Sequence, residues 1–584
     1  MKTIKIFLLL IATNQLFAQK DSLSIKFQKN IPFLDRIIPA QMKQANVKGL
    51  SVGLIDSAGV VWSKGYGFMD VANKKPVDIK TLFCIGSISK IFTSIAIMQL
   101  QERGKLDINK PIKDYIPEFK PLGSEGIINQ ITIASVLSHE SGLPSDDISM
   151  LFSGKPFSSE AVISFFNNHY ICSKPFTNNS YSNISYALLG AVIERVSGQS
   201  FSSYIKQYIT EPLGMKNSSF TMEDYMKPLL SKQYLKNSKE FNEPQASVLP
   251  AGGFYSNIED MSIFAQMLIN KGKYKNTQII SDATFKNMIS VKNADVRRDY
   301  DLRLGLTWFI TMDGTWFKAG GSISHGGDTR VFHSSLTILP YQKVAAIVIG
   351  NSEKAVRIVS QIDRMLLDNA LGIKGLDTCF PKQIISTRKT KTYISPQKFK
   401  DFAGYYSFAT KTMHVKPKRN ALIVKMSPIV LKLQPLADST FSVKLRVLGI
   451  PISNKNISKM WFDIVDNDTI LVTTSWDRDF YTAKKITPIK PDVLQNWKNK
   501  TGNYVNTDDD KEVFEKANLS IVDNLLVFKT EYNGWKLNIT LNPINNNSAI
   551  INGLGRNTGD RIIFKEENGK IEMDFSGIKL QKIQ

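Results

Sequence analysis

Apolar and polar residues follow a period of two near the start of the chain and a helical period soon after it. Residues 50–55 and 60–68 alternate apolar with small or polar positions on either side of a polar turn, which predicts a β-hairpin. Across 88–100 the apolar residues recur at helical spacing, and Gly104 follows as a helix-ending residue. We therefore expect a hairpin followed by a buried helix.

The middle of the chain, about 107–290, is mainly helical in pattern, and strand-like runs return after it. Further helices are expected at 31–47, 158–168, 184–197, 258–270 and 354–371. Strands are expected at 303–310, 322–325, 329–338 and 343–350. Strands at both ends with helices between them predict one antiparallel sheet built from distant parts of the chain, with flanking helices. The fold class is α+β, with a separate helical lobe and a cleft where lobe and sheet meet.

Beyond about residue 393 the pattern changes to short strands and turns, and this part of the chain repeats itself. Residues 404–406 (Gly-Tyr-Tyr) reappear as 502–504 (Gly-Asn-Tyr), and further landmarks recur in the same order. Such repetition indicates a duplicated unit, and each copy is long enough for a small closed barrel. We expect a first domain, a linker and two small all-β barrel-like modules, with the bounds 19–375, 376–392, 393–488 and 489–584.

Residues 1–18 indicate that the protein is exported. Lys2 and Lys5 are followed by an apolar stretch and by Ala18, which is typical of a secretory signal with a small residue at its cleavage site. The stretch is too short to span a membrane, and no later segment is long and apolar enough to do so. We expect a soluble, periplasmic or secreted protein that is not membrane-spanning.

Charge and cysteine content narrow the range of partners and cofactors. The formal net charge is +22, but the lysines are spread along the chain, so a nucleic-acid partner is not expected. The three cysteines, Cys84, Cys172 and Cys379, cannot form an even disulfide framework and show no metal-ligand spacing. We expect no metal and no organic cofactor.

Ser87 and Lys90 are the first candidates for chemistry. Ser87 directly precedes the predicted buried helix, and Lys90 follows one turn later on the same side. Backbone N–H groups at a helix start favour negative charge, and a desolvated lysine can take the proton of the serine hydroxyl. Taken alone, the pattern is more typical of a capping serine and a lysine that extends to solvent. Partners further along the chain decide between these interpretations.

Two further motifs complete a set of three. Residues 181–183 (Tyr-Ser-Asn) stand at the head of a predicted helix, and residues 325–327 (His-Gly-Gly) lie on a predicted strand. With Ser87-x-x-Lys90 they resemble, in order, the three motifs of the serine β-lactamase and penicillin-binding-protein superfamily. The resemblance covers about 20–375 and is greatest to the branch of class C β-lactamases, D-aminopeptidases, DD-carboxypeptidases and related esterases. It implies a β-lactamase/transpeptidase-like fold for this domain.

The resemblance also implies a role for each motif residue. Ser87 attacks a carbonyl carbon and becomes acylated, while Lys90 and Tyr181 share the proton transfers. Which of these two is the general base stays open at this point. Asn183 is implied to bind the amide side chain of the substrate, and His325 to line the opposite wall of the site.

The residues after this histidine are implied to hold the carbonyl oxygen of the substrate. The backbone N–H groups of Ser87 and Asp328 would form the oxyanion hole, and Gly326 and Gly327 let the strand approach the substrate closely. Arg330 is a candidate cation for a substrate carboxylate, because a histidine stands where β-lactamases of the superfamily have a lysine. The alternative is that Arg330 ends a strand and faces solvent.

Other conspicuous residues are expected to be structural. His139 belongs to a loop that is a landmark of the same family, His333 is expected to be packed or on the surface, and Cys84 is expected in the core. The acidic run 508–510 is expected to be a solvated turn. The alternative comes from the D-aminopeptidases that the chain resembles, in which a barrel loop enters the active site, where an acidic loop could read a free amine.

Together these features predict an exported serine hydrolase that cleaves amide or ester bonds through an acyl-enzyme. Small peptides that contain D-amino acids are its expected substrates. The two barrels favour a D-aminopeptidase, and the Tyr-Ser-Asn and His-x-Gly motifs favour a DD-carboxypeptidase. An esterase or a weak β-lactamase of the same family is the alternative, as is a penicillin-binding or sensing protein with negligible turnover. The sequence leaves the substrate, its D or L preference and the oligomeric state open.

Overall fold

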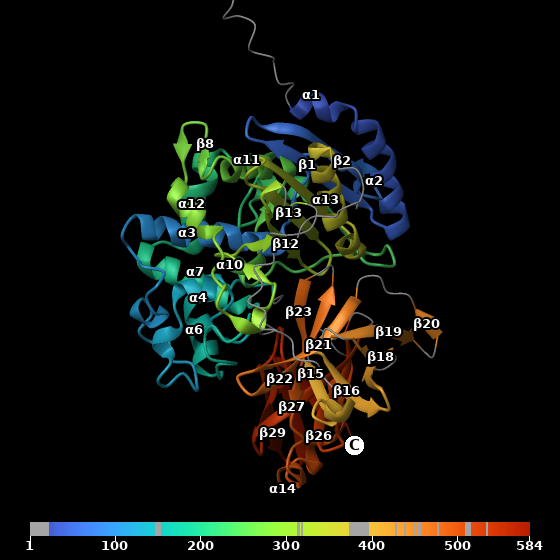
Figure 1. Ribbon diagram of the computed structural model, residues 1–584. Helices are drawn as coiled ribbons and strands as arrows, with labels where there is room; N and C mark the ends of the chain where they lie inside the picture. The colour runs from blue at the N-terminus through green and yellow to red at the C-terminus, as the bar shows by residue number, and fades with distance from the viewer. Residues whose placement is uncertain are drawn as a thin grey trace, which may run out of the picture.

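The computed structural model describes residues 23–146, 154–311, 316, 319–372, 396–426, 429–436, 440–447, 450–452, 457–475, 478–507, 515–532 and 535–583. The expected signal (1–18), the expected linker (376–392) and the acidic run (508–510) lie outside the described residues. In Figure 1 the N-terminal part of the chain carries the helices together with one sheet, and the strands of the C-terminal part lie below it.

One eight-stranded antiparallel sheet forms the centre of the N-terminal part. Its strands, in sheet order, are β10 (Arg303–Leu304), β11 (Phe309–Thr311), β12 (Ser322–Asp328), β13 (His333–Leu339), β14 (Val344–Gly350), β1 (Gly49–Asp56), β2 (Val60–Asp70) and β3 (Lys75–Pro76). The first hairpin, β1 and β2, pairs with β14 in a register that sets Leu50 opposite Gly350. The sheet thus joins the two ends of this part of the chain, as the pattern of strands predicted.

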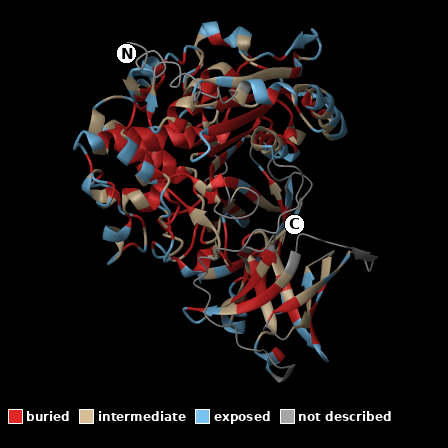
Figure 2. Ribbon diagram, turned by 45° about the horizontal axis from the view of Figure 1, so that its top comes forward, coloured by how far each residue is buried: buried red, intermediate tan, exposed pale blue. Residues whose placement is uncertain are grey.

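Helices cover both faces of the sheet. As a consequence, every residue of β13 and β14 is buried. Successive residues of a strand point to opposite faces. One set from β14 packs with α2 (Ile31–Ala45) and α13 (Val359–Leu371), and the other with α11 (Ile258–Ile269) and α3 (Ser89–Glu102). Figure 2 shows this buried interior in red, with exposed residues concentrated on the outer helices and loops.

The helical lobe is organised around α3, which is buried from Ser89 to Leu100. The other helices of the N-terminal part are α1 (Leu23–Gln28), α4 (Ile133–Leu137), α6 (Ser159–Asn167), α7 (Ile184–Ser197), α8 (Phe201–Ile205), α9 (Glu211–Leu213), α10 (Leu249–Gly252) and α12 (Asp282–Met288). Short strand pairs are β4 (Phe83–Cys84) with β7 (Tyr255–Ser256), β5 (Gln233–Tyr234) with β6 (Glu240–Phe241), and β8 (Lys273–Tyr274) with β9 (Thr277–Gln278). Among the described residues, no helix is long and apolar enough to cross a lipid bilayer.

Two expected strands differ from the observed ones. The run 303–310 is divided into β10 and β11, because the Gly305 N–H donates to the Trp308 carbonyl (2.8 Å) and closes a turn. The run 329–338 becomes a strand only at β13, because a tight turn that begins at Thr329 precedes it. In both places alternating apolar residues continue through a turn, so periodicity alone could not locate the break.

The C-terminal part forms two antiparallel barrels, which confirms the predicted all-β modules. The first contains β15 (Gly404–Phe408), β16 (Lys411–Lys418), β17 (Ala421–Met426), β18 (Ile429–Pro435), β19 (Phe441–Val447), β20 (Ile450–Ile452), β21 (Ile457–Val465), β22 (Asp468–Ser475) and β23 (Arg478–Ile486). It closes where β18 pairs with β19, and β20 is an additional strand beside β19. After α14 (Pro491–Gln495), the second closed barrel contains β24 (Gly502–Asn506), β25 (Lys516–Val522), β26 (Leu525–Tyr532), β27 (Trp535–Asn545), β28 (Ser548–Ile551), β29 (Arg561–Glu567), β30 (Lys570–Phe575) and β31 (Ile578–Ile583).

The repeated landmarks hold equivalent positions in the two barrels. Tyr406 and Tyr504 are fully buried, and each hydroxyl donates to the backbone carbonyl four residues earlier, at 3.0 Å and 2.5 Å. Gly404 and Gly502 adopt φ values of 135° and 138°, a conformation that favours glycine. The sequence repeat therefore reflects one barrel fold used twice.

Both barrels dock on the N-terminal part through polar contacts. In the first barrel, Asp468 forms an ion pair with Arg298 (2.9 Å). In the second, the loop 552–560 between β28 and β29, called the barrel loop below, contacts Ser145. The Asp560 carboxyl accepts the Ser145 N–H (3.1 Å), and the Asn557 N–H donates to Ser145 Oγ (3.0 Å). The barrel loop thereby reaches the segment beside the candidate site.

Candidate active site

Ser87 lies where the segment before α3 is pressed against β12. It belongs to a short 3-10 helix, Gly86–Ile88, that leads into α3. Gly86 has a φ of +52°, and a Cβ built there would lie 2.6 Å from the backbone nitrogen of Asp328. Only glycine fits this conformation and this space. The backbone around Ser87 therefore lies directly beside the end of β12.

Lys90 lies in the first turn of α3 and is fully buried, and its amine contacts the Ser87 hydroxyl. Lys90 Nζ lies 3.1 Å from Ser87 Oγ, 2.7 Å from Asn183 Oδ1 and 2.8 Å from the Ala251 carbonyl oxygen. Burial lowers the pKa of Lys90 well below its ordinary value, and the positive charge of Arg556 lowers it further. A neutral amine at this distance is able to accept the serine proton.

Tyr181 lies over Lys90 and close to the nucleophile. Lys90 Nζ is 4.8 Å from the centre of the Tyr181 ring. Its enclosed position raises the pKa of Tyr181 far above the usual value, and the hydrogen bond with Ser87 opposes this shift only in part. Tyr181 therefore keeps its proton at neutral pH, and its hydroxyl is a donor rather than a base in the resting site.

The segment that carries Tyr181 and Asn183 is held by the loop that follows α4. Ser182 Oγ donates to the Pro144 carbonyl (2.7 Å), and the Asn183 N–H donates to the Ser145 carbonyl (2.9 Å). The Ser182 N–H also donates to Nδ1 of His139, which is buried. His139 thus holds the segment that carries Tyr181 through a hydrogen bond, which agrees with the structural role expected for it.

His325 stands on β12 across from Tyr181, with the two ring centres 6.4 Å apart. Its Nδ1 lies 2.6 Å from the Gly326 carbonyl oxygen, so this nitrogen carries the ring proton. Burial, followed by the charge of Lys90, lowers the pKa of His325 to about 4. The imidazole is neutral at physiological pH, and the wall it forms has no cation at this position.

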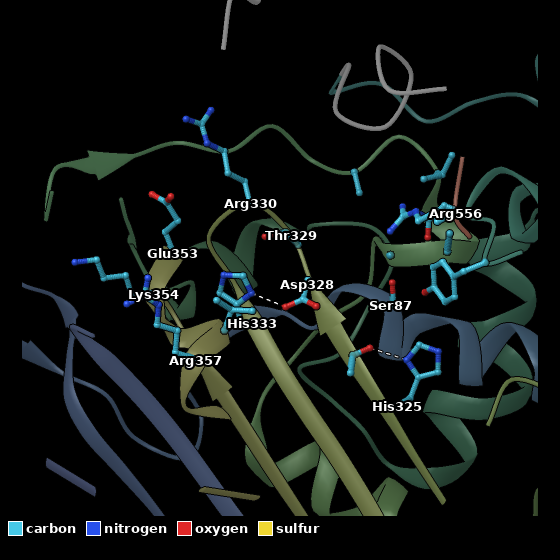
Figure 3. Close-up of a pocket in the computed structure, with 18 of the residues that line it drawn as sticks. Ser87, His325, Asp328, Thr329, Arg330, His333, Glu353, Lys354, Arg357 and Arg556 are labelled. Carbon is cyan, nitrogen blue, oxygen red and sulfur yellow. Dashed lines mark hydrogen bonds and ion pairs between the residues drawn. The ribbon is translucent and has the colours of Figure 1, made fainter. Parts of the chain in front are cut away.

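The end of β12 and the turn after it lie further along the same wall. Asp328 Oδ1 is 2.5 Å from Nδ1 of the buried His333. Arg330 directs its guanidinium to the Phe241 ring, 4.5 Å from the ring centre. In Figure 3 Arg330 points away from Ser87, while Asp328 lies between Ser87 and His333. Arg330 therefore shares the cavity of the nucleophile without standing beside it.

Arg556 and Asp146 are site residues that the sequence reasoning missed. Arg556, on the barrel loop, donates from Nη2 and Nε to Asp146 Oδ2, at 2.5 Å and 2.8 Å. Its guanidinium carbon lies 5.3 Å from the centre of the Tyr181 ring. The only local signal was a glycine-rich run around residue 555 in the second barrel, and nothing in that run pointed to residues 400 positions earlier.

These groups surround one cavity of about 860 Å³. Of the residues expected at the site, the cavity is lined by Ser87, Tyr181, Asn183, His325, Gly326, Asp328 and Arg330. Lys90 is buried behind this lining. In Figure 3 Ser87, His325 and Arg556 lie together at one end, and Lys354 and Arg357 lie at the other. No cluster of side chains suited to a metal ion occurs in the part of the chain that the structure describes.

Comparison with known proteins finds relatives of the N-terminal part. The profile of the family described as Beta-lactamase matches residues 34–368. The chain is similar to Protein flp of Staphylococcus aureus (strain NCTC 8325 / PS 47), with 26% identity over 354 residues, 58% of this chain and 66% of that protein. It is also similar to Beta-lactamase-like protein 2 of Dictyostelium discoideum, with 28% identity over 283 residues, 46% of this chain and 51% of that protein. The chain thus spans just under two thirds of Protein flp.

A solved structure shares the fold. The octameric penicillin-binding protein homologue from Pyrococcus abyssi is similar to this chain with a TM-score of 0.54 and 24% sequence identity. The match covers 78% of this chain and 100% of that chain, which is more of this chain than the family profile covers. At this level of identity the likeness concerns the fold alone.

Proposed function

Because the chain belongs to the Beta-lactamase family, we propose that it is a serine hydrolase that cleaves amide or ester bonds through an acyl-enzyme at Ser87. The observation that carries the proposal is the buried Lys90 amine, 3.1 Å from Ser87 Oγ, with a strongly lowered pKa. A serine hydroxyl is a weak nucleophile unless a nearby base takes its proton. The neutral lysine is the base that this site offers.

The contacts support a division of the proton transfers. Lys90 Nζ takes the proton of Ser87 Oγ as Oγ bonds to the carbonyl carbon, and the Tyr181 hydroxyl gives its proton to the leaving amine or alcohol. The proton on Lys90 then restores Tyr181. Water next attacks the acyl carbonyl carbon while Lys90 takes a proton from it, and this proton passes to Ser87 Oγ as the bond between Oγ and the carbonyl carbon breaks. The N–H groups of Ser87 and Asp328, brought together by the close packing at Gly86, are proposed to bind the carbonyl oxygen.

The substrate class is proposed more narrowly from the family. Small peptides that contain D-amino acids are the first candidates, and small esters and β-lactams are the alternatives. Binding of penicillins with negligible turnover is a further alternative. The neutral His325 argues against a dedicated β-lactamase, because it supplies no permanent cation for a β-lactam carboxylate.

Labelling with a fluorescent fluorophosphonate tests the nucleophile. We expect the native protein to be labelled and Ser87→Ala to lose all labelling and all turnover, because Ser87 Oγ is the hydroxyl that the Lys90 amine contacts. Ser57→Ala, in the turn between β1 and β2, is the control and should label like the native protein. Labelling of Ser87→Ala at the native rate would contradict the proposal.

A substrate panel separates the candidate activities. D-alanyl p-nitroanilide, an acyl-D-Ala-D-Ala peptide, nitrocefin and p-nitrophenyl acetate represent the aminopeptidase, carboxypeptidase, β-lactamase and esterase hypotheses. Multiple turnovers of any one of them would exclude a sensing protein that is acylated only once. Formation of a stable penicillin adduct without turnover of any of these four substrates would instead favour the sensing protein.

Export is proposed from the character of residues 1–18. The measurement is the N-terminal sequence of the protein recovered from the producing cells. A mature chain that begins at Gln19 would support export, and an intact N-terminus on the recovered protein would contradict it.

A further inference from the structure

A continuous series of contacts connects the second barrel to the nucleophile. Arg556 on the barrel loop binds Asp146 Oδ2 (2.5 Å), and Asp146 Oδ1 accepts the side-chain amide of Asn183 (2.8 Å). Asn183 Oδ1 in turn lies 2.7 Å from Lys90 Nζ, which lies 3.1 Å from Ser87 Oγ. The two amide positions of Asn183 are thus used on opposite sides, one toward the barrel and one toward the base.

Asp146 depends on the barrel for its counter-charge. Its side chain is only 3% exposed, whereas that of Arg556 is 47% exposed to the solvent of the cavity. A buried carboxylate is costly unless a cation and hydrogen bonds compensate its charge. Arg556 makes two hydrogen bonds to one oxygen of this carboxylate, and it comes from a domain more than four hundred residues away in sequence.

The barrel loop is fixed in the position that this contact requires. On either side of Ser145, the Asn557 N–H and the Asp560 carboxyl hold the loop against the segment that carries Asp146. Gly559 packs so closely that a Cβ built on it would lie 2.4 Å from Cβ of Cys172. The barrel loop is therefore closely packed against the N-terminal part. Figure 3 shows its Arg556 near Ser87 at the same end of the cavity.

We propose that Arg556 is a positioning residue of the hydrolytic site, which through Asp146 and Asn183 holds the Lys90 amine on Ser87 and balances the negative charge of Asp146. The second barrel then completes the catalytic site instead of serving only as an appended module. This inference rests on the serine-hydrolase function proposed above.

The charges that face Lys90 fix the sign of the effect. The polar groups packed around the amine come from several elements and are Ser87, His139, Asp146, Tyr181, Asn183, Tyr186, His325 and Arg556. The two histidines have lowered pKa values, chiefly because of burial, and are neutral at physiological pH. Asp146 and Arg556 are thus the charged pair, and they act on the pKa of Lys90 in opposite directions.

Two substitutions should therefore move the pH profile in opposite directions. Arg556→Gln leaves Asp146 facing the amine, which favours the ammonium form, so the acid limb of the labelling rate should shift to higher pH by about one unit. At a pH below that limb the rate falls about tenfold. Asp146→Asn leaves Arg556 uncompensated, and the acid limb should shift to lower pH.

The experiment uses the full-length protein and records the rate of fluorophosphonate labelling and kcat/KM against pH. Arg561→Gln is the matched control, because Arg561 also joins the second barrel to the N-terminal part, over Tyr170, but does not line the cavity. It should leave the limb in place. Arg556→Lys keeps a charge and should restore the position of the limb while recovering only part of the plateau rate.

The outcomes separate this inference from the proposed function. Unchanged limbs in Arg556→Gln and Asp146→Asn, with Ser87→Ala inactive, would overturn the positioning role and leave the hydrolase intact. Retained labelling of Ser87→Ala would overturn the hydrolase itself. A lower plateau with an unmoved limb would mean a merely structural role for Arg556, which also counts against the proposal.

Discussion

Gly327 is the position at which the site has the least room for a side chain. A Cβ there would lie 1.9 Å from the Ile85 carbonyl oxygen, which no side chain tolerates. Ser334 Oγ donates to the same carbonyl (2.9 Å) and holds the two segments together. The approach that brings the N–H groups of Ser87 and Asp328 together therefore depends on a glycine at this position.

Substitution of this glycine should disable the site. In Gly327→Ala the methyl group forces β12 away from the segment before α3, so the proposed oxyanion groups separate. We expect the labelling rate to fall by about 100-fold or more, and the free energy of unfolding to fall by about 1–3 kcal/mol. Labelling reactions quenched at set times measure the rate, and thermal unfolding measures the stability.

Gly326→Ala is the neighbouring control. A Cβ on Gly326 would have the Ser334 carbonyl oxygen at 3.8 Å as its nearest contact, which is an ordinary packing distance. This variant should keep the native midpoint of unfolding. Equal labelling rates in the Gly327→Ala and native proteins would contradict the role assigned to the close approach.

The loops that carry the site residues are joined by a buried pair of carboxyl groups. Burial, together with the neighbouring Asp299, raises the pKa of Glu140 far above its ordinary value, and the two groups share a hydrogen bond. Asp299 also accepts the Asn179 N–H (2.7 Å), two residues before Tyr181. Glu140 follows His139 directly, so the pair connects the His139 loop with the segment that carries Tyr181.

This pair predicts a pH dependence of stability. The folded protein keeps a proton on Glu140 that the unfolded chain loses above its ordinary pKa, so the stability from this group is complete below that pKa and declines as the pH rises. Glu140→Gln still offers a donor to Asp299 but has no proton to lose. Its midpoint of thermal unfolding should exceed the native one by an amount that grows from pH 5 to pH 9.

Glu118→Gln serves as the comparison for this prediction. Glu118 is 45% exposed and pairs with Arg195, which lowers its pKa instead of raising it. Its substitution should give a difference from the native protein that is constant across the same pH range. A constant difference for Glu140→Gln would show that Glu140 is ionised in the folded protein, against the prediction.

At the scale of the whole molecule, the second barrel and the N-terminal part meet at a surface that leaves little room for a larger side chain. Gly559 has a φ of +85° and lies against Cys172, and the buried Asp560 beside it has a pKa raised to about 7, chiefly by burial. The same loop carries Arg556. The loop that docks the barrel on Ser145 is therefore also the loop that brings Arg556 to Asp146.

A substitution in the docking surface should act on catalysis from a distance. Gly559→Ala places a methyl group 2.4 Å from Cβ of Cys172 and moves the barrel loop outward. We expect its acid limb to shift to higher pH, as for Arg556→Gln, with a reduced labelling rate. The pH profile of labelling is the measurement.

The second barrel also offers a control for this change. Gly569 has a similar φ of +74°, yet a Cβ there would have no atom within 4 Å. Gly569→Ala has the same backbone cost of about 1 kcal/mol without touching the docking surface. It should keep the native profile, and a native profile for Gly559→Ala as well would separate docking from catalysis.

Local patterns in the sequence determined most of the fold and the centre of the site. Periods of two and 3.6 residues report which face of an element is buried, so they predicted α7, α11 and β14 closely. The duplicated barrels were visible because the buried Tyr406 and Tyr504 are needed at the same place in each copy. The motifs of Ser87 and Tyr181 could be found because they resemble those of a known family, and each residue lies just before a helix.

Tertiary structure alone decided which distant charges act on those residues. Arg330, which the sequence offered as a candidate cation, stacks on Phe241, and Arg556 of the barrel loop stands over Tyr181 instead. Neither position follows from periodicity, because the docking of two separately folded units depends on the shapes of their surfaces. Electrostatic interactions depend on distance in space, so the balance of charge at Lys90 became visible only when Asp146 and Arg556 were brought together by the fold.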